Sequence, residues 1–316
     1  MRVWIIFHRT LDPAKEEVPE ILRFQDTARR LGVDLAVLKP QDFELVVATS
    51  RAWEVHHRTT TLRKPDYVIA RTGAETRYFT LAVLRQLQRK GVELVNDPEA
   101  IEATADKLRS LQILAAAGIP IPRTILAKFP VDVDLVEREL GFPVVVKTLK
   151  GTRGSGVLLC NDRAQFGDLA SLLSGAKPGE DFIFQRYVRA SHGRDVRLLV
   201  VGGKVVAAME RRSSDGGFKS NISLGGTAAA FDPPREMKRL AERAAKVLNL
   251  DIAGIDILFD EEGYRVCEAN SAPGFQGLER ALGIDVPEII FRWLQRRRKF
   301  IEGPLLQWFE TSGSDW

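Results

Sequence analysis

Short apolar runs alternate with amphipathic stretches along the first third of the chain. Residues 3–7 (VWIIF) and 67–70 (YVIA) have the length and composition of buried strands. Residues 19–31 repeat apolar positions with helical spacing and are followed by Gly32, a frequent helix terminator, and residues 79–88 predict a second helix. Further strand-like runs lie at 35–38 and 92–95. This alternation predicts a small open parallel sheet with helices on its faces.

The next stretch opens on a helix signal. Asp97 and Pro98 supply a cap and a first-turn proline, and the apolar pattern continues through residues 106–115, which predicts one helix across the whole segment. Residues 132–140 predict another helix, and the apolar residues 144–147 predict the strand that follows it. The stretch therefore reads as a second α/β unit.

Strands and helices alternate again from about residue 181. Three strands are predicted at 182–185, 195–201 and 204–210, the last two forming a hairpin. Residues 216–226 are long, glycine-rich and polar, which predicts either a functional lid or a disordered segment.

The helices of this third stretch end in a basic run. Residues 234–249 are strongly amphipathic, and their apolar stripe favours core packing. Further helices are expected at 276–282 and 287–294. The run at 296–299 (RRRK) predicts the end of the last helix, where cations complement the helix dipole, in preference to a nucleic-acid patch.

Acidic side chains stand in a hairpin pattern at residues 253–274 (AGIDILFDEEGYRVCEANSAPG). Two strand-like runs flank turn residues, and this hairpin places Asp256 beside Glu268. The two-residue period of a strand puts Glu268 and Asn270 on one face. Oxygen ligands without Cys or His suit Mg²⁺. A solvated sheet face is the alternative, but a carboxylate among Ile and Leu needs a partner or a metal.

A glycine-rich segment, residues 150–156 (KGTRGSG), lies between two predicted strands. Its backbone N–H groups can fold over an anion, because glycine approaches closely and adopts positive φ freely. The segment lacks the ending of a Walker A loop and, unlike a dinucleotide fingerprint, opens no helix. A flexible hairpin loop is the alternative. Lys147 in the preceding strand strengthens the case for phosphate contact, with snorkelling from the sheet as its alternative.

The polar residues 51–64 predict a loop that carries two adjacent histidines, His56 and His57. Adjacent side chains point apart on a helix or a strand. Exposed loop histidines are therefore favoured over a metal site.

The composition is that of an ordinary soluble protein with two or three domains. The 316 residues are 45% hydrophobic and 28% charged, and 46 Lys+Arg against 42 Asp+Glu give a formal charge of +4, too weak to indicate nucleic acid. No apolar run reaches membrane-spanning length, and the amino terminus lacks a signal-peptide pattern. Cys160 and Cys267 are the only cysteines, so a disulfide framework is not expected and a cytoplasmic protein is predicted.

Ordered motifs across the second and third stretches resemble the ATP-grasp superfamily, and within it the RimK-type α-L-glutamate and amino-acid ligases. The resemblance covers about residues 96–282 and is carried by segments 96–124, 144–157, 184–188, 193–212, 218–226, 253–258 and 266–275. It implies an α/β (α+β grasp) fold. The expected division is an N-terminal α/β pre-ATP-grasp domain (1–96), a central ATP-grasp subdomain with the glycine-rich loop (97–184), a C-terminal subdomain with the metal site (185–300) and a tail (301–316).

The resemblance also implies roles for individual residues. The implied ATP-binding residues are Lys107, Lys147, Gly151, Gly154, Ser155, Gly156, Gln185, Arg186, Tyr187, Asp195, Lys219, Ser220 and Asn221. The implied ligands of Mg²⁺ or Mn²⁺ are Asp256, Glu268 and Asn270, and the implied catalytic residues are Arg197, Arg211 and Asn221. Adenine would be bound by backbone groups at Arg186 and Tyr187 and the ribose by Asp195. Arg186 stands where relatives are expected to carry an acid, and Lys219 where they often carry Arg.

The activity that the resemblance implies is an ATP-dependent carboxylate–amine ligase that releases ADP. A carboxylate attacks the γ-phosphate to give an acylphosphate, and an amine then displaces phosphate to form an amide. Arg197 and Arg211, from neighbouring predicted strands, would neutralise the charge at the acyl site, with a solvated strand face as the alternative.

The expected partners are small molecules and peptides. The resemblance implies an amino acid, glutamate in the first instance, added to a peptide, a protein C-terminus or a small metabolite. Neither nucleic acid nor membrane is an expected partner, and a homo-oligomer is expected although no pattern gives the number of copies. Two alternatives stay open at this point, a catalytically silent ATP-binding regulatory module and a nucleic-acid-binding protein.

Overall fold

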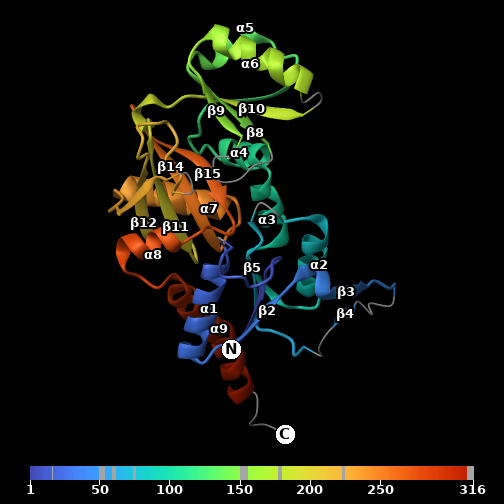
Figure 1. Ribbon diagram of the computed structural model, residues 1–316. Helices are drawn as coiled ribbons and strands as arrows, with labels where there is room; N and C mark the ends of the chain where they lie inside the picture. Colours follow the sequence, from blue (N-terminus) through green and yellow to red (C-terminus); the bar gives the residue numbers. More distant parts are fainter. Residues whose placement is uncertain are drawn as a thin grey trace.

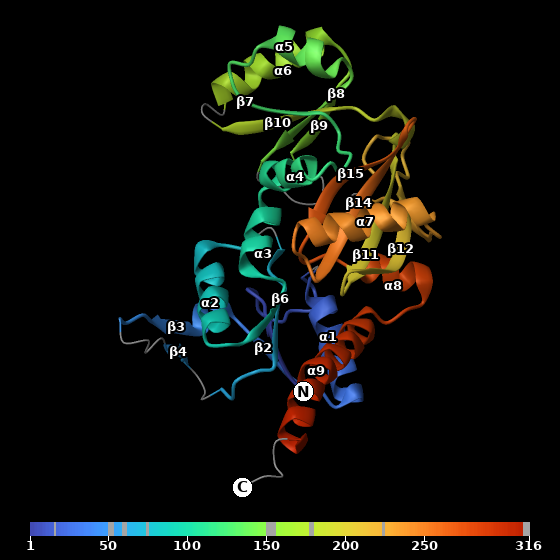
Figure 2. The same cartoon turned by 180° about the vertical axis from the view of Figure 1, so that it is seen from behind.

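Three sheets of four or five strands, each with its helices, succeed one another along the described chain. The computed structural model describes residues 1–15, 17–49, 54–58, 62–73, 76–149, 156–176, 180–222 and 225–311, with the backbone alone at residues 176 and 299–311. Figures 1 and 2 show the three parts stacked along the length of the molecule. The amino-terminal part lies at one end, the part with helices α5 (Val133–Leu140) and α6 (Arg163–Ala176) lies at the other, and the remaining sheet lies between them.

A parallel sheet with the strand order β2-β1-β5-β6 forms the amino-terminal part. Its strands are β1 (Arg2–Ile6), β2 (Asp34–Leu38), β5 (Tyr67–Ala70) and β6 (Glu93–Val95). Ile5 and Ile69 face a core shared with helix α1 (Val18–Leu31), whereas Ile6 and Val68 face a second core shared with helix α2 (Tyr78–Arg89). The predicted open parallel sheet with helices on both faces is confirmed.

Residues 54–57 form a strand where the sequence predicts a loop. Strand β4 (Glu54–His57) pairs antiparallel with β3 (Phe43–Val46). The prediction was wrong because the segment has few apolar residues, and its pairing with β3 supplies the order instead. His56 Nε2 lies 2.8 Å from Glu54 Oε2, while the His57 ring packs against Phe43. The two histidines diverge, as their adjacency predicts.

Two helices stand where one is predicted after Asp97. Asp97 caps helix α3 (Pro98–Ala105) and Asp106 caps helix α4 (Lys107–Ala116). Asp106 has an extended backbone, and its side chain accepts hydrogen bonds from the N–H groups of Leu108 and Arg109. An aspartate that caps its own helix interrupts the preceding one. As a result, Lys107 occupies the first position of α4.

The central part is an antiparallel sheet covered on one face by α5 and α6. Its strands are β7 (Thr124–Lys128), β8 (Val144–Thr148), β9 (Val157–Cys160) and β10 (Asp181–Arg186), in the order β7-β10-β8-β9. Val146 and Phe184 are paired and belong to the core beneath the helices. Lys147, paired with Ile183, therefore points to the opposite face. The expected boundary at 184/185 falls inside β10, and we propose a division after Arg186, which keeps this sheet whole.

The third part is an antiparallel sheet with the order β13-β12-β11-β14-β15. Its strands are β11 (Arg194–Val201), β12 (Lys204–Arg212), β13 (Thr227–Ala230), β14 (Ile252–Asp260) and β15 (Gly263–Asn270). Helix α7 (Arg235–Val247) covers the face that carries Leu198 and Ile255. The predicted α/β class is confirmed, with a parallel sheet followed along the chain by two antiparallel sheets.

The last helix runs much further than the sequence predicts. After α8 (Gln276–Leu282), helix α9 spans Val286–Thr311 and so includes the basic run that was expected to end it, together with most of the predicted tail. Arg297 Nη1 donates a hydrogen bond to Asp251 Oδ2 at 2.6 Å, and Arg298 Nη1 donates one to Asp66 Oδ2 at 3.0 Å. These cations join α9 to strand ends and do not complement a helix terminus. Within the described part of the chain, even α9 is not apolar enough to cross a membrane.

Candidate active site

One face of the β11–β15 sheet changes from apolar to charged along its strands. Leu199 and Val201 on β11 pack toward the amino-terminal part, whereas Asp195 and Arg197, on the same face, carry charge. Strand pairing places the other charged residues beside them. Arg211 lies opposite Asp195, Asp256 opposite Arg197, and Glu268 opposite Asp256. Four neighbouring strands thus place their charged side chains on one surface.

Buried ion pairs link the acids and arginines of this surface. Arg211 Nε and Nη2 each donate to Asp195 at 2.7 Å, and Arg211 Nη2 also contacts Asp256 Oδ2 at 2.9 Å. Arg197 Nε and Nη2 each donate to Asp256 at 2.7 Å. Arg211 and Asp256 are each 4% exposed. Burial opposes ionisation of Asp256, but the two guanidinium groups outweigh it and lower its pKa to about 2.

The arginines therefore neutralise Asp256 in this structure. The sequence predicts Arg197 and Arg211 on neighbouring strands, and the structure confirms this. The sequence also predicts that both face an acyl site, whereas the structure shows both guanidinium groups bound to Asp256. Their role toward an acyl group stays a prediction. Asp195, expected at a ribose, is likewise bound on both oxygens, by Arg211 and by the Ser220 hydroxyl at 2.8 Å.

Glu268 and Asn270 present the oxygen donors that remain on β15. Their strand forms the predicted hairpin with β14, and Glu268 is exposed. Asn270 Nδ2 is buried without a hydrogen-bond partner in the described structure. An amide turned by 180° would put its oxygen there, where a cation could bind it. Within the described residues no group of three His, Cys, Asp or Glu side chains is arranged so that it could hold a metal ion by itself. The set is thus two carboxylates and an amide, which suits Mg²⁺.

Two lysines from other elements approach this set. Lys147 Nζ from β8 lies 3.7 Å from Cys267 Sγ, next to Glu268. Lys107 Nζ, from the start of α4, donates to Leu149 O at 3.3 Å. Burial lowers the pKa of Lys107, the charge of Glu268 opposes that shift, and the charge of Lys147 adds to it. Lys107, Lys147 and Glu268 are therefore close enough to interact, between the central sheet and the third sheet.

The glycine-rich loop lies mostly outside the described residues, and with it Gly151, Gly154 and Ser155. Gly156, where description resumes, has φ +71°, and a Cβ there would meet Thr148 Oγ1 at 2.4 Å. Only glycine accommodates both the conformation and the contact. The N–H of Thr148 donates to Gly156 O, which closes the base of the loop directly after Lys147.

In the segment expected to bind adenine, the side chains of Gln185 and Tyr187 have partners within the protein. Gln185 Nε2 donates to Thr124 Oγ1 at 2.9 Å, and the Tyr187 hydroxyl bonds His192 Nδ1. Arg186 is exposed, and its N–H donates to Arg123 O at 2.9 Å. Recognition through the remaining backbone groups stays a prediction.

The segment that follows β12 contributes one buried polar residue. Ser220 is 7% exposed and bonds Asp195, while Lys219 and Asn221 beside it are half-buried. Lys219 Nζ lies 5.7 Å from the centre of the Phe218 ring. Through Ser220 this segment is joined to the ion-pair surface. The ATP-binding role expected for Lys219, Ser220 and Asn221 stays a prediction.

Comparison with known proteins agrees with this geometry. Residues 104–294 match the RimK-like ATP-grasp domain and residues 13–101 the RimK PreATP-grasp domain. The chain belongs to the RimK-like ATP-grasp family. A probable alpha-L-glutamate ligase of Halorhodospira halophila is 38% identical over 278 residues, which are 88% of this chain and 91% of that protein. The predicted family is confirmed, and with it the prediction of an ATP-dependent ligase that forms amide bonds.

Solved structures share the fold of this RimK-like protein. The ATP-grasp ligase PsnB, in complex with a precursor variant, Mg and ADP, has a TM-score of 0.71 at 21% identity, covering 93% of this chain and 97% of that chain. D-alanine–D-alanine ligase from Bacillus anthracis has a TM-score of 0.65 at 16% identity, covering 95% and 99%. Both support the ATP-grasp architecture.

Cys267 is a site residue that sequence reasoning missed. The register shifts after Asp256, so that Glu268 and Val266 pair with consecutive residues of β14 and Cys267 is the extra residue of a bulge. The bulge turns the thiol toward Lys147, and burial raises the pKa of Cys267 while Lys147 opposes that shift. Its position directly before Glu268 was the one signal available.

Removal of the Lys147 ammonium group is expected to weaken nucleotide binding by the RimK-like protein. For Lys147→Ala we expect the Kd for ATP to rise about 10–100-fold, because a charge-assisted contact contributes about 1.5–3 kcal/mol. Calorimetric titration with ATP measures it. The control Lys204→Ala removes an exposed lysine that pairs with Glu242, and should leave the Kd unchanged. An unaltered Kd in the Lys147 variant would remove this residue from the phosphate site.

Proposed function

We propose that this RimK-like ligase couples glutamate to a carboxylate-bearing acceptor at the expense of ATP, and releases ADP and phosphate. The observation that carries the proposal is that Lys147 lies 3.7 Å from the Cys267 thiol, directly before Glu268 in the chain, with Lys107 close enough to interact with both Lys147 and Glu268. Two ammonium groups beside exposed oxygen donors suit a triphosphate with its cation. The site has no need of a nucleophilic side chain, because both steps use groups of the substrates.

The residues of the third sheet fit a divalent cation. Glu268 and Asn270 would hold Mg²⁺, with Asp256 adjoining them and bound to its two arginines. The unpartnered amide of Asn270 is the observation that supports this fit. Bound there, Mg²⁺ would supply charge neutralisation for the phosphate groups. Mn²⁺ has the same donor preference and is proposed as a substitute.

The chain's own groups act at each step of the proposed reaction. Lys107 and Lys147 hold the phosphates in line with the acceptor carboxylate, whose oxygen bonds to the γ-phosphorus as ADP leaves. The glutamate amine then bonds to the acyl carbon, phosphate leaves, and the amine loses a proton. Negative charge gathers in the first step, and Arg197 and Arg211 lie on the same surface to oppose it.

The acceptor of glutamate and the cellular compartment are proposed from different observations. A peptide or protein C-terminus is the acceptor class we propose first, since PsnB, which shares the fold, is described with a precursor peptide. A small metabolite with a free carboxylate is the alternative. The free thiols of Cys160 and Cys267 support a cytoplasmic setting. The predicted homo-oligomer stays a prediction.

A screen of amino acids against acceptors tests the proposal. Purified protein with ATP and Mg²⁺ is offered each amino acid together with pools of peptides or small carboxylates, phosphate release is recorded, and products are weighed by mass spectrometry. We expect release only with glutamate and an acceptor together, and a product heavier than the acceptor by one glutamyl residue. Binding of ATP without release under every condition would instead indicate a silent regulatory module.

A further inference from the structure

The loop that follows Asn270 is held by side chains from the amino-terminal half of the chain. Asn96 Nδ2 donates to Ser271 O at 2.8 Å, and Arg71 Nη1 donates to Pro273 O at 3.0 Å. The N–H of Phe275 donates to Glu20 Oε1 at 2.8 Å. Three backbone groups within five residues are thus fixed by partners that lie far away in sequence.

The three partners come from separate elements of the amino-terminal part. Glu20 lies on α1, Arg71 directly follows β5, and Asn96 directly follows β6. The carboxyl ends of the parallel strands β5 and β6 share one edge of their sheet, so the loop is seated on that edge. Asn96 also donates to Ile252 O at 2.9 Å and accepts from its N–H at 2.8 Å, which fixes the start of β14 against the same edge.

Glu20 and Arg71 form a buried ion pair beneath the loop. The two side chains are 6% and 8% exposed, and Arg71 Nη2 donates to Glu20 Oε2 at 2.5 Å. The Arg71 guanidinium also lies 5.5 Å from the centre of the Phe275 ring. A buried ion pair is weak evidence for stability, because its desolvation cost can exceed its Coulomb energy. Its orientation of the loop is therefore the better account of its presence.

The seated loop in turn constrains the sheet beside Asn270. Gly254 pairs with Asn270, and a Cβ on Gly254 would lie 2.6 Å from Pro273 Cβ. The loop therefore folds back over its own hairpin and contacts the residue opposite Asn270. A displacement of Pro273 would change the surroundings of the Asn270 amide.

We propose that Glu20, Arg71 and Asn96 are positioning residues, which hold the 271–275 loop so that Asn270 faces the cation site. The proposal rests on the function proposed above. It makes the amino-terminal part a determinant of cation affinity. Glu20 and Arg71 act from a distance, because they bond each other and the 271–275 loop and not the proposed metal ligands Glu268 and Asn270. Residues that orient metal ligands through intermediate bonds commonly change metal affinity about 10–100-fold when removed.

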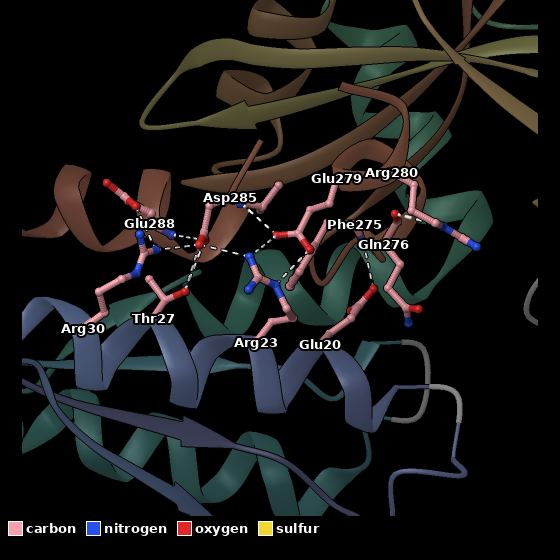
Figure 3. A network of polar contacts seen from close by, with 11 residues as sticks. Glu20, Arg23, Thr27, Arg30, Phe275, Gln276, Glu279, Arg280, Asp285 and Glu288 are labelled. Carbon is pink, nitrogen blue, oxygen red and sulfur yellow. Dashed lines mark hydrogen bonds and ion pairs between the residues drawn. The ribbon is translucent and has the colours of Figure 1, made fainter. Parts of the chain in front are cut away.

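The same interface contains ion pairs that do not touch the loop. Figure 3 shows Arg23 and Arg30 of α1 reaching residues at α8 and the start of α9, while Glu20 of the same helix reaches Phe275. Arg23 Nε lies 3.1 Å from Glu279 Oε2, and Arg30 Nη2 lies 2.7 Å from Asp285 Oδ2. Arg23 is 39% exposed. It joins the same two parts as Glu20, so Arg23→Gln is the matched control for loss of interface stability.

Cation binding measured without turnover tests the positioning role. Mn²⁺ serves as the probe, and its free concentration is followed by electron paramagnetic resonance in the presence of ADP. Glu20→Gln keeps an acceptor for the Phe275 N–H and removes the charge that orients Arg71. We expect its Mn²⁺ affinity to fall about tenfold, while ADP affinity without metal stays unchanged. Arg23→Gln should lower the thermal unfolding midpoint and leave Mn²⁺ affinity unchanged.

Arg71→Lys and Asn270→Ala make the outcome decisive. Lysine keeps the positive charge but lacks the planar guanidinium that bonds Glu20 and the Pro273 carbonyl at the same time. Arg71→Lys should therefore also lower Mn²⁺ affinity. This variant tests the positioning role even if Glu20→Gln fails to fold. Wild-type Mn²⁺ affinity in both Glu20→Gln and Arg71→Lys, alongside a loss in Asn270→Ala, would overturn the positioning role and leave the cation site standing. Unchanged affinity in Asn270→Ala as well would overturn the cation site itself.

Discussion

Replacement of Glu268 by glutamine is expected to abolish ATP-dependent ligation. Glu268 is the exposed carboxylate of the charged surface, opposite Asp256 and close to Lys107. Asp256 is already bound by two arginines, so Glu268 supplies most of the negative charge available to a cation. Loss of such electrostatic stabilisation typically lowers the rate by about 10²–10³-fold. Phosphate release at saturating ATP and Mg²⁺ measures the effect.

A control on the same hairpin separates this role from a general loss of negative charge. Glu262 lies at the hairpin turn, 87% exposed and 3.6 Å from Arg265. Glu262→Gln changes the net charge by the same amount and should retain wild-type turnover. If Glu268→Gln retained it too, the cation role of Glu268 would be rejected, and the charged surface would need another explanation.

The hairpin that carries Glu268 was predictable because its signals are local. Alternating apolar residues, turn residues and a second alternating run specify the two strands and their antiparallel direction within twenty residues. They do not specify the bulge at Cys267, which shifts the register so that Asp256 pairs with Glu268. Local signals also specify α1 and β5, where periodicity and a terminating glycine set the bounds. That Lys147 lies on the face of β8 opposite helices α5 and α6 follows from strand alternation alone.

What local pattern could not supply is the order of strands. The predicted hairpin of β11 and β12 is correct, but β14 pairs with β11 across a separation of some sixty residues. That pairing puts Asp256 between Arg197 and Arg211. The sequence predicts the two arginines at an acyl group and Asp256 at a metal ion, but in the structure they bind one another. Charge alone is consistent with either arrangement. Only the sheet topology decides which partner lies within reach.

The contacts that seat the 271–275 loop are still more remote. Glu20 and Phe275 are 255 positions apart, and Arg71 and Pro273 are 202 apart. Glu20 read as one polar position of an amphipathic helix, and its burial at 5% exposure contradicts that pattern. Arg71 directly follows a fully apolar strand at the carboxyl edge of a parallel sheet, where ligand-binding residues are common. That position was the available signal.

Replacement of Asp256 by asparagine is expected to destabilise the protein even without nucleotide or metal. The change keeps the shape of the side chain but leaves Arg197 and Arg211 without the charge that they share. Removal of one member of a buried ion network typically costs about 3–5 kcal/mol, because the remaining charges stay buried without compensation. Urea unfolding at pH 7 in the presence of a chelator measures the free energy of unfolding without any contribution from a bound cation.

Asp260→Asn is the matched control, since Asp260 lies on the same strand and pairs with Arg265 at a more exposed position. There a loss of about 1 kcal/mol or less is expected.

The dependence of the free energy of unfolding on pH, below about pH 4, gives a second criterion. The pKa of Asp256 is lowered from 3.8 to about 2, so its stabilisation is complete above 3.8 and is lost as the pH falls toward 2. Asp256→Asn should therefore show a smaller decline in stability over that interval than the wild type. Equal declines, or a cost no larger than that of Asp260→Asn, would mean that the arginines are stabilised by other groups and that Asp256 is free to serve a cation.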